Sequence, residues 1–262
     1  MIKEFFKKLN IKAGLLHFIC NDRMVVFCHA SIPQAFRTSY KKVAFTLAEV
    51  LITLAIIGVV AALTLPTLNK KIKDLREMSR LKQTYSTISQ AIKLSQIEYG
   101  EVGTWGIEGV EVEDAELIAN KLKPYLKIAI DCGVTNDKKC IYDGKYKYLK
   151  EYNTNNATSS DYGRQNNYYK IVLQNGIAIW WRGGNSEVAL IVVFIDLNGK
   201  KGPNCWGKDL FAFEYSEKSK AFVPFGHPNG TVPYTTSCTP NSTGYGCTYY
   251  ALNVLKSLDL KF

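Results

Sequence analysis

Two patterns of apolar residues follow each other in the first hundred residues of the chain. Phe45–Leu65 is apolar all round a helix and carries a single charge, Glu49, near its start. About 20 such residues, at about 1.5 Å per residue, cross the hydrocarbon core of a membrane. The first pattern therefore predicts a membrane-spanning helix that contains one acidic residue.

Beyond Pro66 the apolar residues recur at steps of three and four, which is typical of a helix with one buried face. We expect one continuous helix over Phe45–Tyr99, ended by Gly100, with its second half packed on a globular body. Pro66 should bend this helix or loosen one turn, because proline has no N–H to donate. The residues expected on the packed face are Leu68, Ile72, Leu75, Met78, Leu81, Tyr85, Ile88 and Ile92.

After residue 167 the pattern changes to that of β-strands. Asn175-Gly176 lies between two short apolar runs and predicts a β-hairpin. The expected strands are Tyr168–Leu173, Ile177–Trp181, Val188–Asp196, Leu210–Tyr215 and Ala221–Pro224. With one short helix over Glu113–Leu122 and an otherwise irregular stretch from 101 to 167, the sequence predicts an α+β fold. In it, a long N-terminal helix packs on a C-terminal antiparallel sheet.

Charge separates the first 44 residues from the rest. The chain has 262 residues, 47% of them apolar, and a formal net charge of +10, but residues 1–44 alone contain eight Lys/Arg and two Asp/Glu. A basic end beside an apolar span favours retention on the cytoplasmic side. We therefore divide the chain into a leader (1–44), a spanning helix (45–66) and a head with its amphipathic helix (67–262). Met24 offers a second start that would shorten the leader.

Five of the seven cysteines follow the apolar run and would meet an oxidising compartment if that run directs export. Cys132 and Cys140 are close in sequence, as are Cys238 and Cys247, and each pair brackets turn residues. We expect disulfides within these two pairs and a single Cys205, although five cysteines allow other pairings. A zinc site is less favoured, because the chain has no C-x-x-C motif.

The stretch KKVAFTLAEVLITLAIIGVVAALTLP resembles the N-terminus of type IV pilins and of type II secretion pseudopilins. In that family a basic leader is cut before a phenylalanine, which is then N-methylated; the fifth mature residue is glutamate and the twenty-second is a helix-distorting proline. Phe45, Glu49 and Pro66 match these positions. The family prefers glycine before the cut, and this chain has Ala44.

The resemblance implies a pilin-like fold and a structural role. A membrane peptidase and methylase would act on Ala44 and Phe45. Glu49 would then pair with the N-terminal amine in a bundle of such helices, since a charge inside an apolar environment persists only when paired. A chance acidic residue that reaches the headgroups is the alternative. Other implied partners are pilin-like subunits, an inner-membrane assembly platform and, before assembly, membrane lipid.

A second, shorter resemblance lies in IDLNGKKGPNCWGKDLFAF (Ile195–Phe213), which looks like the D-x-N-G…PN…G-x-D-x-F segment of many pseudopilin-like proteins. It favours a type II secretion pseudopilin, stored as a single-pass protein of the inner membrane with its head in the periplasm. A type IV pilin or minor pilin is the alternative, and nucleic acid is an expected partner only for a DNA-uptake form. The rival from another class is a signal-anchored binding or enzymatic domain that never polymerises.

Asp196, Asn198 and Asp209 supply oxygen atoms around a glycine-rich turn, the ligand type that calcium prefers. The family resemblance adds weight to this interpretation, because major pseudopilins carry a calcium site in their C-terminal loop. A turn closed by Asx hydrogen bonds explains the same residues, and the spacing of an EF-hand is absent. Calcium is thus a possible cofactor and no other is expected.

Motifs of catalysis are missing from the sequence. It has no G-x-S-x-G, H-E-x-x-H, P-loop or G-x-G-x-x-G, and its last histidine, His227, lies in a loop of prolines and glycines. We do not expect an enzyme.

Overall fold

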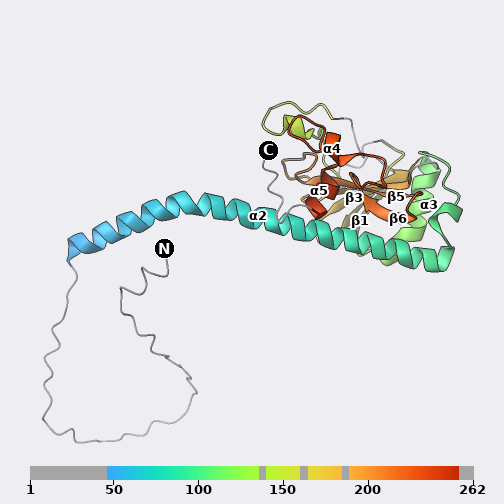
Figure 1. Cartoon of the computed structure of the whole chain (residues 1–262). Helices are drawn as coiled ribbons and strands as arrows, with labels where there is room; N and C mark the ends of the chain where they lie inside the picture. Colours follow the sequence, from blue (N-terminus) through green and yellow to red (C-terminus); the bar gives the residue numbers. More distant parts are fainter. Residues whose placement is uncertain (1–45, 136–139, 160–164, 185–188, 254–262) are drawn as a thin grey trace, which may run out of the picture. The chain divides into compact units, whose positions relative to one another are not determined.

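The computed structural model describes residues 46–135, 140–159, 165–184 and 189–253 (Figure 1). Its helices are α2 (Leu47–Tyr99), α3 (Val112–Leu122), α4 (Tyr234–Ser237) and α5 (Cys247–Asn253), with single 3₁₀ turns at Val102–Thr104, Lys123–Tyr125 and Leu149–Glu151. Its strands are β1 (Ile128–Gly133), β2 (Tyr169–Leu173), β3 (Ala178–Gly183), β4 (Ala189–Asp196), β5 (Leu210–Ser216) and β6 (Ala221–Pro224). We call residues 78–253 the head.

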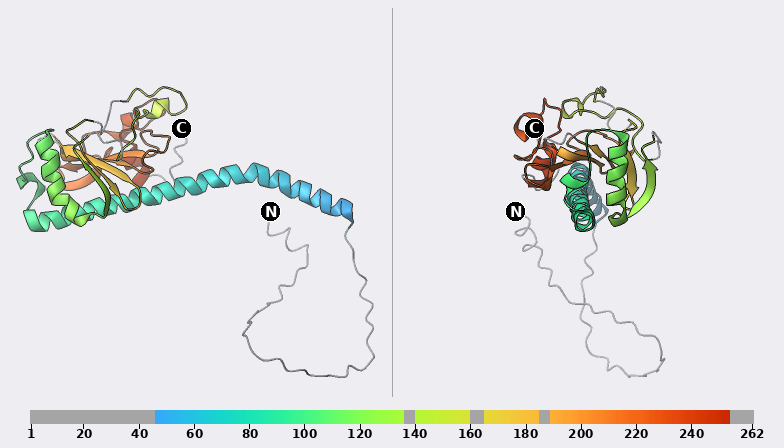
Figure 2. Two further views of the ribbon diagram at one scale, coloured as in Figure 1. Left: turned by 180° about the vertical axis from the view of Figure 1, so that it is seen from behind. Right: turned by 90° about the vertical axis from the view of Figure 1, so that its right-hand side faces the viewer.

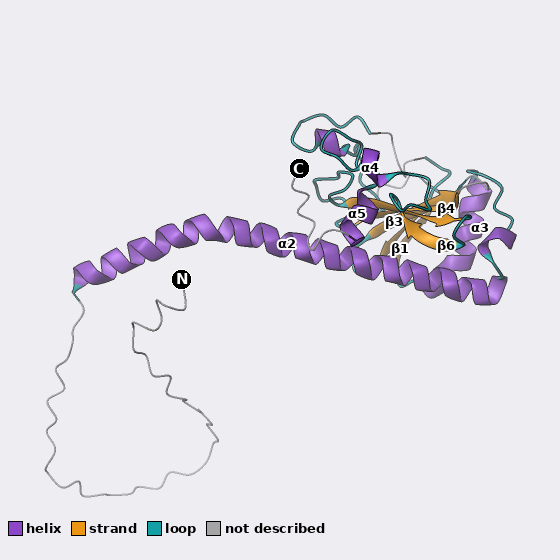
Figure 3. Ribbon diagram, in the orientation of Figure 1, coloured by secondary structure: helices purple, strands orange, loops and turns teal. Residues whose placement is uncertain are grey.

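The six strands form one antiparallel sheet in which spatial order equals chain order, β1 to β6. Figure 3 draws the strands in orange. The turn between β2 and β3 is the predicted hairpin. In this turn the N–H of Gly176 donates to the carbonyl of Leu173 at 2.9 Å, and Gly176 has a φ of +79°. A type I turn followed by a left-handed residue is a common three-residue hairpin loop, and glycine adopts that conformation without strain.

One face of the sheet is covered by α2 and α3, as both views in Figure 2 show. The indole N–H of Trp181 in β3 donates to the carbonyl of Ala115 in α3 at 3.0 Å. Tyr85 of α2 stacks on Phe213 and Phe222, with ring centroids 5.2 and 5.8 Å apart, and its hydroxyl donates to the carbonyl of Phe222 at 3.0 Å. This face holds the larger of the hydrophobic clusters in the head.

The opposite face of the sheet is also buried, under the long connections of the head. Trp180 stacks on Phe194 of the neighbouring strand, and Tyr146 and Trp206 pack beside them from the loops. Trp180 and Trp181 therefore lie in different clusters on the two faces, as alternation along a strand requires. Because both faces are covered, β4 and β5 are buried along their whole length.

The packed part of α2 begins later than the sequence predicts. Met78, Leu81, Ile88 and Ile92 are buried, but the earlier members of the same face are about half exposed: Leu68 by 52%, Ile72 by 46% and Leu75 by 45%. The expectation that the second half of the helix packs from Leu68 onward is therefore wrong. Residues at steps of three and four share a face, but the head does not extend along α2 as far as that face does.

α2 ends where the sequence places its end. Gly100 has a φ of +80°, and its N–H donates to the carbonyl of Gln96 at 3.0 Å, which is the left-handed C-cap that glycine favours. The predicted α+β fold, with a long N-terminal helix against an antiparallel sheet, is confirmed. The prediction that residues 101–167 are irregular apart from one short helix is wrong at β1, which lies within this stretch.

The outer strands of the sheet are short or irregular. β1 pairs with β2 through a register that shifts twice, between Ile128 and Ile130 and between Asp131 and Gly133. β6, at the other edge, has four residues and ends in Pro224. The pairing of β6 with β5 is regular, so β6 differs from the inner strands in its length and its terminal proline.

Candidate functional site

The first candidate site is the apolar segment Leu47–Leu65 at the start of α2. Its side chains are exposed, apart from a half-buried Ala61; Leu51 is 58% exposed and Leu63 73%. Of the helices in the described part of the chain, α2 is long and apolar enough to cross a membrane, and the apolar window that meets this test has none of its residues buried. The head therefore provides no cover for this segment.

Glu49 stands at the beginning of this segment and takes part in the start of the helix. The N–H and the hydroxyl of Thr46 both donate to Oε2 of Glu49, at 2.8 and 2.9 Å, and the N–H of Glu49 donates to Oγ1 of Thr46 at 3.3 Å. This reciprocal pairing is a capping box. The sequence signal for it is Thr-x-x-Glu before an apolar run.

Pro66 lies inside α2, and the helix continues through it (Figure 1). Proline cannot donate to the carbonyl four residues earlier, so one hydrogen bond of the helix is missing at Ala62. On either side, the hydroxyls of Thr64 and Thr67 donate to the carbonyls of Val60 and Thr64 at 2.9 and 2.8 Å. Ala44 and Phe45, the residues of the expected cleavage site, lie outside the described residues, as does the leader.

The second candidate site is the polar turn Asp196–Asp209 between β4 and β5. Asp196 is buried at the end of β4; its Oδ2 accepts from the hydroxyl of Tyr146 at 2.9 Å and its Oδ1 from the N–H of Asn198 at 3.1 Å. Asp209 is also buried and accepts from the N–H groups of Asn204 and Cys205 at 2.8 and 2.7 Å. The structure thus brings the three predicted residues together, since the amide of Asn198 donates to Asp209 at 3.0 Å.

Burial raises the pKa of both carboxyl groups in the polar turn. The pKa of Asp196 lies well above its usual value because of burial and the nearby charge of Asp209. Burial raises the pKa of Asp209 to about 6, against hydrogen bonds from Cys205 and Asn204 that favour the charged form. At neutral pH these two carboxyl groups are therefore less readily both charged than two exposed aspartates are.

Calcium fits these residues poorly. Each carboxylate oxygen of Asp196 and Asp209 accepts from a donor of the protein, which leaves Oδ1 of Asn198 as the side-chain oxygen of the predicted set without one. With its amide nitrogen toward them, Asn204 donates to the carbonyls of Lys201 and Gly199 at 3.2 and 3.3 Å. The described residues hold no group of three or more His, Cys, Asp or Glu side chains arranged for a metal. A turn closed by its own hydrogen bonds accounts for the geometry.

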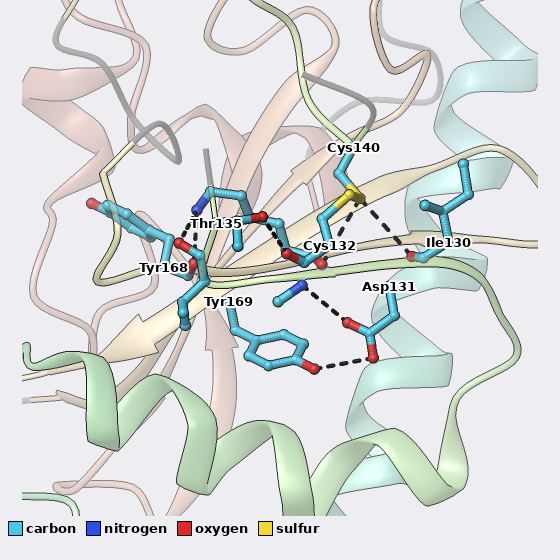
Figure 4. The surroundings of a disulfide bond; sticks show 10 residues. Ile130, Asp131, Cys132, Thr135, Cys140, Tyr168 and Tyr169 are labelled. Carbon is cyan, nitrogen blue, oxygen red and sulfur yellow. Dashed lines mark hydrogen bonds between the residues drawn. A yellow bond between two sulfur atoms is a disulfide. The ribbon is translucent and has the colours of Figure 1, made fainter. Parts of the chain in front are cut away.

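The two expected disulfides are present. Cys132 at the end of β1 is bonded to Cys140, and Cys238 after α4 is bonded to Cys247 at the start of α5. Figure 4 shows the first of them above Asp131 and Tyr169, whose hydroxyl donates to Asp131 at 3.0 Å. Cys205 is the free cysteine of the described residues; it is buried, and burial raises the pKa of its thiol to about 12.

Lys170 in β2 is a buried cation that the sequence analysis does not single out. Its Nζ donates to the carbonyls of Tyr168, Gln165 and Val134 at 2.9, 3.0 and 3.3 Å, so it joins the disulfide loop to the loop before β2. Burial lowers its pKa to about 8. Its position in an alternating strand gives no signal for this role, because the partners are backbone atoms of distant loops.

The head of this chain matches a known protein family. A family model matches residues 67–251, more than half of the chain. The chain belongs to the family of unknown function DUF6613. The DUF6613 region begins directly after Pro66 and includes the packed part of α2, the sheet and most of α5, while the apolar segment lies outside it. No curated protein and no solved structure matches the chain.

Proposed function

We propose that this protein is a pilin-like structural subunit of a type II secretion pseudopilus. It is stored in the inner membrane, cleaved after Ala44, methylated on Phe45 and then polymerised through the apolar segment of α2. The observation that carries the proposal is this segment itself: a continuous helix whose apolar side chains are exposed and whose single carboxylate lies near its beginning. The N-terminal motif built on Phe45, Glu49 and Pro66 supports the same role.

An exposed apolar helix of this length needs an apolar environment. A Leu or Ile side chain that is fully exposed to water is about 1.5–3 kcal/mol less favourable than one that is fully buried. The segment is therefore unstable in water unless another apolar surface covers it. A bilayer supplies that cover to a single chain, and a bundle of equivalent helices supplies it in a filament. One segment can therefore act first as an anchor and later as the core of a polymer.

Glu49 gives this bundle a polar contact. Before cleavage, Thr46 supplies donors to its carboxylate. Cleavage before Phe45 would create a cationic amine four residues away, and the amine of a neighbouring helix could approach in the same way. A paired charge in an apolar bundle fixes the axial register, as a buried polar residue does in a coiled coil.

The mass of the mature N-terminus tests the proposal. Protein isolated from its own cells should begin at Phe45 and carry one additional methyl group there. An intact leader, or cleavage at another site, would contradict the pilin-like role and favour a signal-anchored domain. Genes for a secretion ATPase and an outer-membrane channel beside this one would support a pseudopilus, and genes for a retraction ATPase would support a type IV pilin.

Two substitutions of Glu49 separate its roles. Glu49→Gln keeps a side chain that can complete the capping box but removes the charge, whereas Glu49→Ala removes both. We expect both variants to be processed and neither to enter filaments, measured as mature protein in sheared or overexpressed pseudopilus fractions. If Glu49→Gln assembles normally and Glu49→Ala does not, helix capping rather than charge pairing is the function of this residue.

A further inference from the structure

The stretch of α2 between the apolar segment and the head has a distinct composition. In residues 67–77 four basic side chains are exposed, and none of the residues in this stretch belongs to a hydrophobic cluster of the head. We call these four residues the basic collar: Lys70, Lys71, Lys73 and Arg76. At about 100° per residue they spread over about 220° of the helix circumference. Asp74 and Glu77 lie in the same stretch and reduce its net charge to +2.

The position of the collar along the helix matches the headgroup layer of a bilayer. The apolar segment ends at Leu65, so Lys70 follows it by about 8 Å and Lys73 by about 12 Å. The polar layer of each leaflet is about 5–8 Å thick beyond the hydrocarbon core. Side chains of a helix lean toward its N-terminus, and here that direction is toward the membrane. Long lysine side chains can therefore place their ammonium groups among the lipid phosphates.

We propose that the basic collar binds the phosphate groups of anionic lipids in the leaflet that faces the head. The proposal rests on the membrane-stored state in the proposed function and on nothing in its polymerised state. The half-exposed apolar residues Leu68, Ile72 and Leu75 alternate with the collar residues along the same stretch of α2. An amphipathic stretch of basic and apolar residues is suited to the interface between headgroups and acyl chains. The collar holds the subunit at a fixed depth until it is extracted.

Lipid retention by the full-length chain tests this proposal. The protein in detergent micelles is titrated with phosphatidylglycerol or with phosphatidylcholine, and bound lipids are counted by native mass spectrometry. We expect a preference for phosphatidylglycerol of about fivefold or more, since each Lys or Arg near an anionic surface strengthens binding by about that factor. The preference should decrease as salt is raised, because screening weakens exposed charges.

Matched variants locate the binding. K70Q/K71Q/K73Q should lower the preference to what the basic residues of 1–44 retain, whereas K82Q/K93Q/K218Q, which removes three exposed lysines elsewhere, should leave it at the wild-type value. Equal retention of both lipids by the wild type, or equal loss in both variants, would overturn the collar as a lipid site. Displacement of phosphatidylglycerol by the same concentration of inorganic phosphate would also overturn it, in favour of a general anion site.

Flotation with phosphatidylcholine vesicles keeps this result separate from the proposed function. A chain that floats but shows no lipid preference refutes the collar and leaves the anchor intact. A chain that does not float refutes the anchor, and the collar with it. Cleavage and methylation at Phe45 do not enter either measurement.

Discussion

Lys170 shows how a single residue can make the stability of the head depend on pH. Its ammonium group is buried against three backbone carbonyls and forms no ion pair among the described residues. Its pKa in the folded state is about 8, against about 10.5 for an exposed lysine. Between these values the unfolded chain binds more protons than the folded chain. Stability should therefore rise with pH in this range.

We expect Lys170→Met to remove this pH dependence. Relative to the variant, the wild type should gain about 1 kcal/mol of unfolding free energy between pH 7 and pH 9. Chemical denaturation followed by tryptophan fluorescence measures the difference, because all four tryptophans are buried in the head. A constant difference between the two proteins at both pH values would mean that Lys170 is not responsible.

The carboxylates of the polar turn lead to a prediction about calcium binding. Since their oxygens already accept from donors of the protein, neither added calcium nor a chelator should change the melting temperature of the full chain. Asp209→Ala should destabilise the head by about 1–3 kcal/mol, because it leaves the N–H groups of Asn204 and Cys205 buried without an acceptor. A calcium-dependent rise in the wild type that Asp209→Asn abolishes would restore the calcium interpretation.

At the scale of elements, α2 contains three consecutive parts with different surroundings. The apolar segment is exposed, the collar stretch is exposed and basic, and the part from Met78 to Ser95 is packed on the sheet. The same helical periodicity runs through the last two parts, so sequence alone assigned them to one buried face. What it lacked was the length of the head along the helix, which depends on tertiary structure.

The same substitution at two points of α2 tests this boundary. Leu81 is fully buried and Leu75 is 45% exposed. Leu81→Ala should cost about 2–5 kcal/mol of unfolding free energy, whereas Leu75→Ala should cost less than about 0.5 kcal/mol. Denaturation of the two variants under identical conditions provides the comparison. Equal losses would extend the packed face back toward Pro66.

The sheet was predictable where local signals were strong. Asn175-Gly176 marked the hairpin, and the apolar runs of β4 and β5 marked strands buried on both faces. β1 was not predicted because its sequence, IAIDCG, does not alternate apolar and polar residues. Its residues are exposed or half-buried, so burial did not select such an alternation. In the candidate site, the sequence paired the cysteines and grouped Asp196 with Asp209. It could not show that backbone donors already occupy both carboxylates.

At the scale of the whole molecule, the disulfides close two loops that belong to different parts of the head. Cys140 lies in the aromatic cluster of the loop-covered face, and Cys238 and Cys247 lie in a separate small cluster with Leu149. Each bridge spans eight or nine residues of sequence. Of the described residues in these loops, 134–135 and 239–246 belong to no helix or strand.

Removal of each disulfide should therefore lower stability, and the two losses should add. We expect about 2–3 kcal/mol for C132A/C140A and a similar loss for C238A/C247A, from the entropy that each short loop regains in the unfolded state. The measurement is the melting temperature of the two variants that lack one bridge and of the variant that lacks both. The wild type in reductant is a further comparison. A bridge whose loss changes nothing would be dispensable for the fold.

The outer strands of the sheet bear on how many heads can be brought close together. Subunits concentrated in a membrane or a filament would hold their sheets at high local concentration, where a straight free strand can pair with the next sheet and start aggregation. The irregular register of β1 and the short β6 with its terminal Pro224 make poor templates for such pairing. If the subunits assemble as proposed, the helices rather than the sheets would make the contacts between copies.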